Sequence, residues 1–248
     1  MLKDLPSKID DELAETIRRA VSPRTTTPGF AVRNPDTINP IAMPPWFIDR
    51  CRRAYLSATG NQLLGARLIG ITSSLRGEGK TSLAIGIATA IAADTQQPTL
   101  LLECDLERPS LHRYFGFEPK HGLVDYLEGR AKLRIIKGGP LANLFVTPSG
   151  QPQPDPSRLF YQLSEGGLVE QLRHHFAAVV IDLPPMLSIA YSSLASQLSD
   201  RILLVARYGV TSIDDLEKAI FLLGRERVSG IVLNGTEYRT PEFLRRRL

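Results

Sequence analysis

The segment from Ser74 to Thr81 reads Ser-Leu-Arg-Gly-Glu-Gly-Lys-Thr and carries residue types that bind phosphate groups. Glycines at 77 and 79 allow backbone N–H groups to close around phosphate oxygens, and a helix that begins at Lys80 adds partial positive charge. The Lys80 ammonium would reach the β and γ phosphates, and the Thr81 hydroxyl would ligate Mg²⁺. The segment therefore predicts a phosphate-binding loop for Mg-ATP. Its expected nucleotide-binding residues are Ser74, Gly77, Glu78, Gly79, Lys80, Thr81 and Ser82.

Two aspartates follow apolar segments downstream of this loop. Asp182 ends the run 178–181, and Asp105 comes shortly after the run 99–102. Ligands of open α/β sheets bind at the carboxyl ends of such strands, where a carboxylate reaches the metal. Asp105 can coordinate Mg²⁺ or accept a proton from an attacking hydroxyl or water, and the plain alternative is a solvated acidic loop. We expect Lys80, Asp105 and Asp182 to be catalytic, and Thr81, Asp105 and Asp182 to hold Mg²⁺.

Apolar strands and helical segments alternate along the part of the chain that must position these residues. The predicted strands are 68–72, 99–103, 144–147, 177–182, 201–207 and 228–234, with helical segments from 46, 80, 109, 123, 156, 190 and 212. Alternation of this kind predicts an α/β fold. The strands are unbroken apolar runs, as in a sheet covered on both faces. The predicted fold is a P-loop NTPase with a mostly parallel sheet covered by helices on both faces.

The 248 residues divide into three parts. Repeated prolines over residues 1–45 deny that segment a long regular element, apart from a possible short helix at 11–20, so we interpret it as a partly disordered tether. Residues 46–236 form the predicted nucleotide-binding domain, and 237–248 form a short basic tail.

Composition excludes several classes of protein. No apolar run approaches the ~20 residues that cross a bilayer, and the first residues lack the apolar core of a signal peptide. Two cysteines are too few for a disulfide framework or a zinc cluster. A net charge of +4 gives no indication of nucleic-acid binding. We therefore expect a cytoplasmic protein with no nucleic-acid partner.

With these segments in hand, the chain resembles the bacterial tyrosine kinase family of capsular and exopolysaccharide biosynthesis. This family is a branch of the deviant Walker ATPases, and the resemblance covers about residues 46–236. The segments that carry it are Thr72–Thr81, Asp105–Leu111, Gly122–Gly129, Pro148–Pro156, Asp182–Pro185 and Gly230–Gly235. Leu75 stands where the chromosome-partition and septum-placement branch has its signature lysine, which separates the two branches.

The resemblance implies roles for individual residues. Lys80, Thr81 and Asp182 would carry ATP and Mg²⁺, Asp105 would support the metal or act as general base, and Asn234 would hydrogen-bond the adenine. The family pattern differs at two places, because it has aspartate at 103 and arginine at 107 where this chain has glutamate. Glutamate is one methylene longer than aspartate, which puts the metal geometry at position 103 in question.

The resemblance also implies partners. Such kinases work with a membrane-bound chain-length determinant, or polysaccharide co-polymerase, which would recruit the chain to the inner face of the membrane. A homo-oligomer or an ATP-dependent dimer is expected, although Asp49, Arg52 and Tyr55 meet the family's oligomerisation pattern only in part. The family's C-terminal tyrosine cluster is absent, since Tyr238 is the one tyrosine after the last predicted strand.

These observations lead to one principal hypothesis and two alternatives. The principal hypothesis is an ATP-dependent protein-tyrosine-kinase-like phosphotransferase or ATPase in exopolysaccharide or capsule biosynthesis and export. The first alternative is a nucleotide-gated interaction module of the same system without kinase activity. The second is a partition-type ATPase that binds DNA or membrane through 245–247, and Leu75 argues against it.

Overall fold

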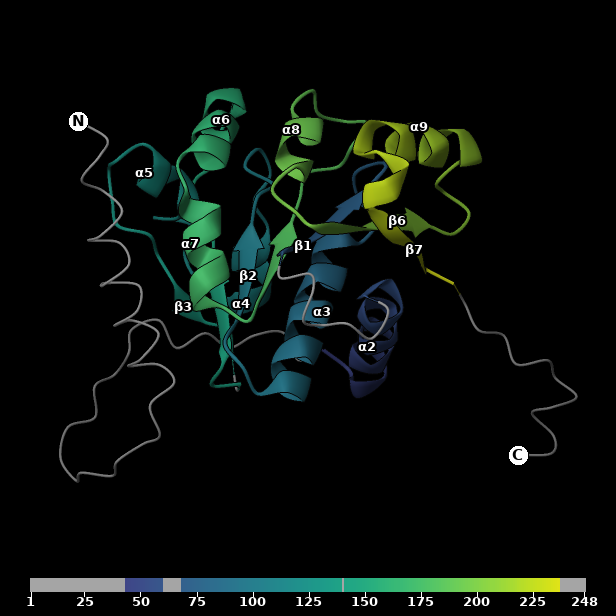
Figure 1. Ribbon diagram of the computed structural model, residues 1–248, viewed down its shortest axis with the longest axis horizontal. Coiled ribbons are helices and arrows are strands. Elements are labelled where there is room, and N and C mark those ends of the chain that lie inside the picture. Colours follow the sequence, from purple (N-terminus) through teal and green to yellow (C-terminus); the bar gives the residue numbers. More distant parts are fainter. Residues whose placement is uncertain (1–42, 60–67, 140, 237–248) are drawn as a thin grey trace, which may run out of the picture.

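The computed structural model describes residues 43–59, 68–139 and 141–236 (Figure 1). The predicted tether, apart from residues 43–45, its short helix at 11–20, and the basic tail lie outside the described residues. A seven-stranded sheet runs through the centre in the order β3-β4-β2-β5-β1-β6-β7. All neighbouring strands are parallel except β3 and β4. The predicted α/β fold with a mostly parallel sheet is confirmed.

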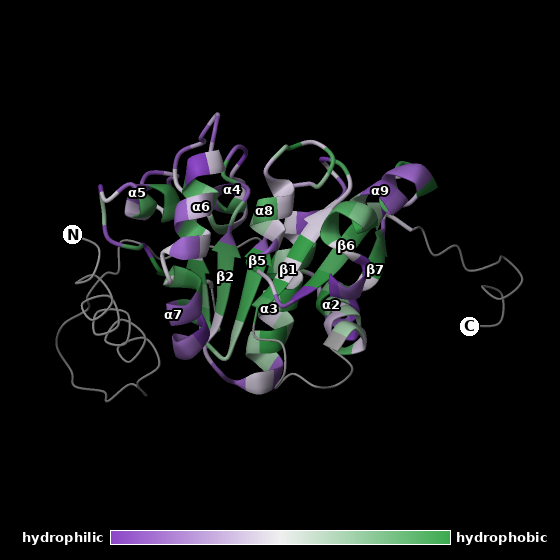
Figure 2. Ribbon diagram, turned by 45° about the horizontal axis from the view of Figure 1, so that its top comes forward, coloured by the Kyte–Doolittle hydropathy of each residue, from purple (hydrophilic) through white to green (hydrophobic). Residues whose placement is uncertain are grey.

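The strands of the sheet centre are buried along their whole length. Every residue of β1, β2, β4 and β5 is buried, as a sheet covered on both faces requires. The strands are β1 (Leu68–Ser73), β2 (Thr99–Glu103), β3 (Ile136–Lys137), β4 (Leu144–Thr147), β5 (Ala178–Asp182), β6 (Arg201–Arg207) and β7 (Val228–Asn234). In Figure 2, β1, β2 and β6 are largely green, whereas α6 and α7 carry purple segments.

Helices cover both faces of the sheet. One face packs against α2 (Pro45–Thr59), α3 (Lys80–Thr95) and α4 (Leu111–Phe115). The other packs against α5 (Leu123–Leu127), α6 (Ser157–Glu165), α7 (Leu168–His175), α8 (Ser192–Ser196) and, at the β6–β7 end, α9 (Ile213–Leu223). A short 3-10 turn, Arg225–Arg227, leads from α9 into β7. Because successive residues of a strand face opposite sides, Val180 joins the first core and Val179 the second.

Two local features differ from the sequence prediction. The sequence did not indicate β3, a two-residue strand antiparallel to β4, because a two-residue run carries no periodicity. The residues Thr211-Ser-Ile-Asp214 have a capping-box pattern that predicts Thr211 as the N-cap of the last long helix, and this prediction is wrong by one residue. Ser212 is the N-cap of α9 and accepts a hydrogen bond from the Asp215 N–H at 3.0 Å. The Thr211 hydroxyl is used elsewhere, on Glu78.

The helices of the described residues have at most 16 residues, whereas a helix that crosses a bilayer needs about 20. Within residues 43–59, 68–139 and 141–236, none of them combines the length and the apolar character needed to cross a bilayer.

Candidate nucleotide and phosphotransfer site

The phosphate-binding loop lies between β1 and α3, at the carboxyl edge of the sheet. Gly77 and Gly79 have φ angles of 80° and 98°, in the left-handed region that favours glycine. A side chain at Gly79 would also collide with the amide of Asn234. Gly79 is the N-cap residue of α3, so the first N–H groups of a 16-residue helix point toward this loop. The backbone therefore has the shape that the sequence predicted for phosphate binding.

Four predicted site residues meet behind this loop. The Lys80 Nζ lies 2.9 Å from Asp105 Oδ2 and 3.3 Å from Asp182 Oδ1, and the Thr81 hydroxyl donates to Asp182 Oδ2 at 2.8 Å. All four residues are buried, with Asp182 fully so. Burial alone would lower the pKa of Lys80, but the charges of Asp182 and Asp105 outweigh it and raise that pKa. Lys80 is therefore a cation at neutral pH.

The donor set of this cluster fits Mg²⁺ bound together with phosphate. Among the described residues, no group of three His, Cys, Asp or Glu side chains is arranged as an all-protein metal site. Mg²⁺ commonly binds through one or two carboxylates, with substrate phosphates and water completing its shell. Asp182 offers a carboxylate oxygen and Thr81 offers a hydroxyl oxygen. Asp105 offers a second carboxylate close to Lys80. Ser74 belongs to the same loop, and its buried Oγ has no hydrogen-bond partner in the described residues.

Glu103 ties the loop after β2 to its surroundings. Its Oε1 accepts hydrogen bonds from the N–H groups of Ser110 at 2.5 Å and Leu111 at 2.7 Å. Its Oε2 accepts from the Ser149 N–H at 3.0 Å. Burial raises the pKa of Glu103 to about 7, and the three N–H donors oppose that rise. In this structure, the Glu103 carboxylate therefore holds backbone N–H groups of two neighbouring loops.

Glu107 and Ser110 lie on the same loop, close to the P-loop. Glu107 pairs with Arg76 at 2.7 Å, so the residue that replaces the family's arginine is neutralised by a P-loop arginine. The Ser110 hydroxyl lies 3.4 Å from the hydroxyl of Thr81. The loop that carries Asp105 is thus fastened both to α4 and to the P-loop.

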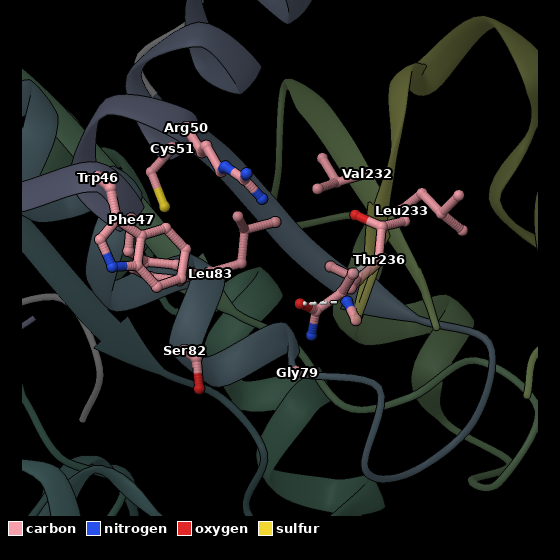
Figure 3. Close-up of a pocket in the computed structure, with 13 residues that line it drawn as sticks. Trp46, Phe47, Arg50, Cys51, Gly79, Ser82, Leu83, Val232, Leu233 and Thr236 are labelled. Carbon is pink, nitrogen blue, oxygen red and sulfur yellow. Dashed lines mark hydrogen bonds between the residues drawn. The ribbon is translucent and has the colours of Figure 1, made fainter. Parts of the chain in front are cut away.

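Besides the buried cluster, a pocket of about 380 Å³ opens beside the P-loop (Figure 3). Trp46 and Phe47 of α2 line one side of it, and the end of β7 lines the other, with Gly79 of the P-loop between them. The two rings meet edge to face, with centroids 5.9 Å apart. A pocket with aromatic walls beside a P-loop has the size and character of a nucleoside site.

Asn234 lines this pocket, as the resemblance implied for the adenine side. Its Nδ2 donates to the Glu78 carbonyl at 2.9 Å, and its Oδ1 accepts from the Gly235 N–H at 2.9 Å. The amide therefore holds the P-loop against the end of β7. Its predicted bond to adenine stays a prediction.

Glu78 links the P-loop to the segment that precedes α9. Its buried carboxylate accepts hydrogen bonds from the Leu75 N–H at 2.9 Å and from the Thr211 hydroxyl. That hydroxyl also accepts from the Arg207 N–H at 2.7 Å. Two segments far apart in the sequence, 75–78 and 207–211, are thus joined through one carboxylate.

The residues of the expected oligomerisation pattern make contacts within the chain. Arg52 binds Asp94 of α3 at 2.7 Å and also pairs with Asp49. The Tyr55 hydroxyl donates to Asp94 at 2.8 Å. These contacts fasten α2 to α3, so in this structure Arg52 and Tyr55 serve the fold of one chain.

Sequence reasoning missed two parts of this site. It gave no role to Trp46 and Phe47, although an aromatic pair at the start of a predicted helix was a visible signal. It missed the Glu78–Thr211 link, for which a sequence separation of 133 residues leaves no local signal.

The remaining predicted residue, Ser82, lines the nucleoside-side pocket, and its hydroxyl lies 3.0 Å from that of Tyr114.

The sheet order, the loop after β1 and the acidic strand ends define a P-loop nucleotide-binding class of α/β protein. A scan against family models found no match. Individual relatives are more informative. The kinase domain of the Escherichia coli tyrosine kinase ETK is 27% identical and superimposes with a TM-score of 0.70, over 78% of this chain and 77% of that domain.

Curated relatives extend this similarity. The tyrosine-protein kinase CpsD of Streptococcus pneumoniae serotype 4 is 32% identical over 204 residues, covering 79% of this chain and 89% of CpsD. The tyrosine-protein kinase wzc of Salmonella typhi is 29% identical over 193 residues, covering 77% of this chain. That match spans only 26% of wzc, so the chain corresponds to about a quarter of the longer relative. The chain belongs to the bacterial tyrosine-protein kinase family.

Proposed function

We propose that this chain binds Mg-ATP and transfers its γ-phosphoryl group to a tyrosine hydroxyl, or to water, as a kinase-like subunit of exopolysaccharide or capsule assembly. The observation that carries the proposal is the buried cluster of Lys80, Thr81, Asp105 and Asp182 beside a pocket of nucleoside size. Membership of a family whose relatives are named tyrosine-protein kinases supports the same conclusion.

The residues of the cluster divide the chemistry among them. Lys80 would neutralise charge on the β and γ phosphates, and Thr81 with Asp182 would hold Mg²⁺, which would supply positive charge against the charge that develops during transfer. Asp105 would accept the proton of the attacking hydroxyl as that oxygen bonds to the γ phosphorus. The bond from phosphorus to the β–γ bridging oxygen breaks in the same step, and ADP leaves. Trp46 and Asn234 would hold the nucleoside.

The proposed partner is a membrane-bound polysaccharide co-polymerase, which would keep the chain at the cytoplasmic face of the membrane. An ATP-dependent dimer or higher homo-oligomer is part of the same proposal. Both rest on the family, and binding to the cytoplasmic segment of such a partner tests them.

Mass spectrometry for phosphotyrosine, after incubation of the purified chain with Mg-ATP and a tyrosine-containing acceptor, tests the activity. Lys80→Ala is the inactive variant, and we expect it to lose at least about 100-fold in turnover because the phosphates lose their preorganised cation. Lys137→Ala, at an exposed lysine on β3, is the matched control. ATP turnover that survives Lys80→Ala would overturn the proposal.

One observation favours the alternative of a nucleotide-gated interaction module. Glu78 joins the P-loop to Thr211, directly before α9, so a change at the phosphates has a physical route to the surface of α9. An ATP-dependent change in assembly size, measured by light scattering, without phosphotyrosine in chain or partner would favour this alternative over the kinase.

A further inference from the structure

A pocket of about 500 Å³ lies beside the loop that carries Asp105. Glu107, Arg108 and Ser110 line it from the segment after β2, and Arg113 lines it from α4. Its opposite wall contains Gln151, from the segment after β4. A hydrogen bond at 2.9 Å, from the Gln153 N–H to the Leu106 carbonyl, joins the two walls. A backbone hydrogen bond thus connects the two loops that line the pocket.

This pocket and the nucleoside-side pocket lie on opposite sides of β1. The nucleoside-side pocket adjoins β6 and β7, whereas the new pocket follows β2 and β4 in the sheet order β4-β2-β5-β1-β6-β7. In-line phosphoryl transfer needs the attacking oxygen opposite the leaving oxygen. An acceptor must then approach from the side away from the nucleoside. The Ser110 hydroxyl, 3.4 Å from that of Thr81, marks where this pocket meets the phosphotransfer site.

The pocket carries positive charge that no carboxylate in the described residues neutralises. Arg108 and Arg113 are exposed, and neither forms an ion pair within residues 43–59, 68–139 and 141–236. The one carboxylate of the lining, Glu107, is taken by Arg76 at 2.7 Å. Burial and then the charge of Arg113 lower the pKa of the neighbouring His112, so His112 is neutral at pH 7 and adds no charge. Two arginine side chains are therefore left to meet a ligand.

We propose that this pocket binds the acidic flank of a tyrosine-bearing peptide segment and so selects the acceptor of the phosphoryl group. The inference builds on the proposed phosphotransfer. Arg108 and Arg113 would pair with carboxylates on either side of the acceptor tyrosine, because arginine forks suit carboxylate oxygens. The prolines at 109, 119 and 152 give the pocket rigid apolar walls, against which an extended peptide packs.

The charge of the pocket also indicates where the acceptor comes from. Residues 237–248 contain four arginines and two glutamates, so the segment is positively charged, although Tyr238 has Glu237 before it and Arg239 after it. Like charge disfavours this segment as the occupant. The occupant that fits the charge of the pocket better is a segment of a partner protein with acidic residues around its tyrosine.

Fluorescence anisotropy tests the pocket without any transfer of phosphate. The probes are two labelled peptides with one central tyrosine, flanked by glutamates in one and by lysines in the other. Both are titrated with the chain in Mg²⁺ and a non-hydrolysable ATP analogue. We expect the glutamate peptide to bind at least about tenfold tighter, and its affinity to fall as salt rises.

Charge reversal of the two arginines should remove this preference. Arg108→Glu with Arg113→Glu should bind the lysine peptide better than the glutamate peptide. Arg201→Glu, at an exposed arginine on the opposite edge of the sheet, is the matched control and should keep the wild-type preference. Binding of a fluorescent ATP analogue in the same samples reports whether the fold and the P-loop remain intact.

The outcomes separate this inference from the proposed function. Equal binding of both peptides by the wild-type chain, or an unchanged preference after charge reversal, overturns the assignment of the pocket even if ATP is hydrolysed. A preference that moves with the arginines supports the assignment even if no phosphotyrosine forms, and in that case only the proposed activity fails.

Discussion

At the carboxyl edges of β1, β2 and β5, charged groups are buried and paired, whereas along β7 and α9 large apolar groups are exposed. Lys80, Asp105 and Asp182 lie together out of water. At the other end of the sheet, Phe221 is 86% exposed and Ile231 is 48% exposed. Stability alone would favour the reverse arrangement, since burial of charge is costly and burial of apolar surface is favourable. Both regions therefore retain features that the fold of one chain does not require.

The two regions differ in how firmly the remainder of the chain holds them. Around the P-loop, side chains from α3, β2, β5, β7 and the segment before α9 form hydrogen bonds that connect these segments. The β7–α9 end has a small core of its own, and β7 is an edge strand with an alternating partly buried pattern. The comparison predicts that substitutions in the first region and in the adjoining core strongly change stability or nucleotide binding. Substitutions at the β7–α9 end should change them little.

The largest effect on stability is expected in the core that supports the first region. Phe160 of α6 is fully buried and stacks on Tyr191 with centroids 5.2 Å apart. Phe160→Ala should lower the free energy of unfolding by about 3–5 kcal/mol, because it removes a buried ring and leaves a cavity. Urea denaturation followed by circular dichroism measures this, and a loss below ~1 kcal/mol would show that the core tolerates the cavity.

A smaller effect is expected where α2 is fastened to α3. The hydrogen bond from Arg52 lowers the pKa of Asp94, and burial opposes that shift less strongly. Stability from this carboxylate is therefore present above its unfolded pKa of about 4 and is lost as the pH falls below that value. Asp94→Asn should cost about 1 kcal/mol at pH 7 and should flatten the acid limb of the stability curve.

Thermal unfolding between pH 3 and 7 measures the contribution of Asp94. Asp49→Asn is the matched control, since Asp49 also pairs with Arg52 but is far more exposed. If both variants change the low-pH part of the stability curve equally, the contact between α2 and α3 is not the cause of that change.

Glu78 joins the two regions, and its replacement sharpens the comparison. In Glu78→Gln, the amide oxygen can accept from the Leu75 N–H while the amide nitrogen donates to the Thr211 hydroxyl, so two charge-assisted hydrogen bonds become weaker neutral ones. We expect the dissociation constant for Mg-ATP to rise about three- to tenfold, with little change in unfolding. Isothermal titration calorimetry measures it, and Glu217→Gln on the exposed side of α9 should leave it unchanged.

The smallest effect on stability is expected at Phe221. Because this ring is exposed, Phe221→Ser should change the free energy of unfolding by no more than about 0.5 kcal/mol. The same urea titration used for Phe160→Ala gives the comparison directly. A loss of about 2 kcal/mol or more in the free energy of unfolding is typical of buried residues and would contradict the contrast between the two regions.

Sequence patterns predicted most of the fold because each strand and helix carries its own signal. The apolar runs of β1, β2, β5 and β6 lie within a residue of their predicted ranges. Parallel strands end at the same edge, so Lys80, Asp105 and Asp182 were expected together, and the structure brings them together. Their roles in catalysis and metal binding stay predictions. Short elements such as β3, and the exact cap of α9, could not be read because one or two residues give no period.

The sequence by itself determined the α/β class, the phosphate-binding loop and the acidic strand ends, because these depend on local spacing and on the polarity of strands. Only the tertiary structure decided which side chains share a partner across long separations. It brought Thr211 to Glu78, Arg76 to Glu107 and the backbone N–H groups near Ser110 to Glu103. Such contacts depend on the order of the strands and on the paths of the loops between them, and strand order is set by the packing of the whole core, which no single segment encodes.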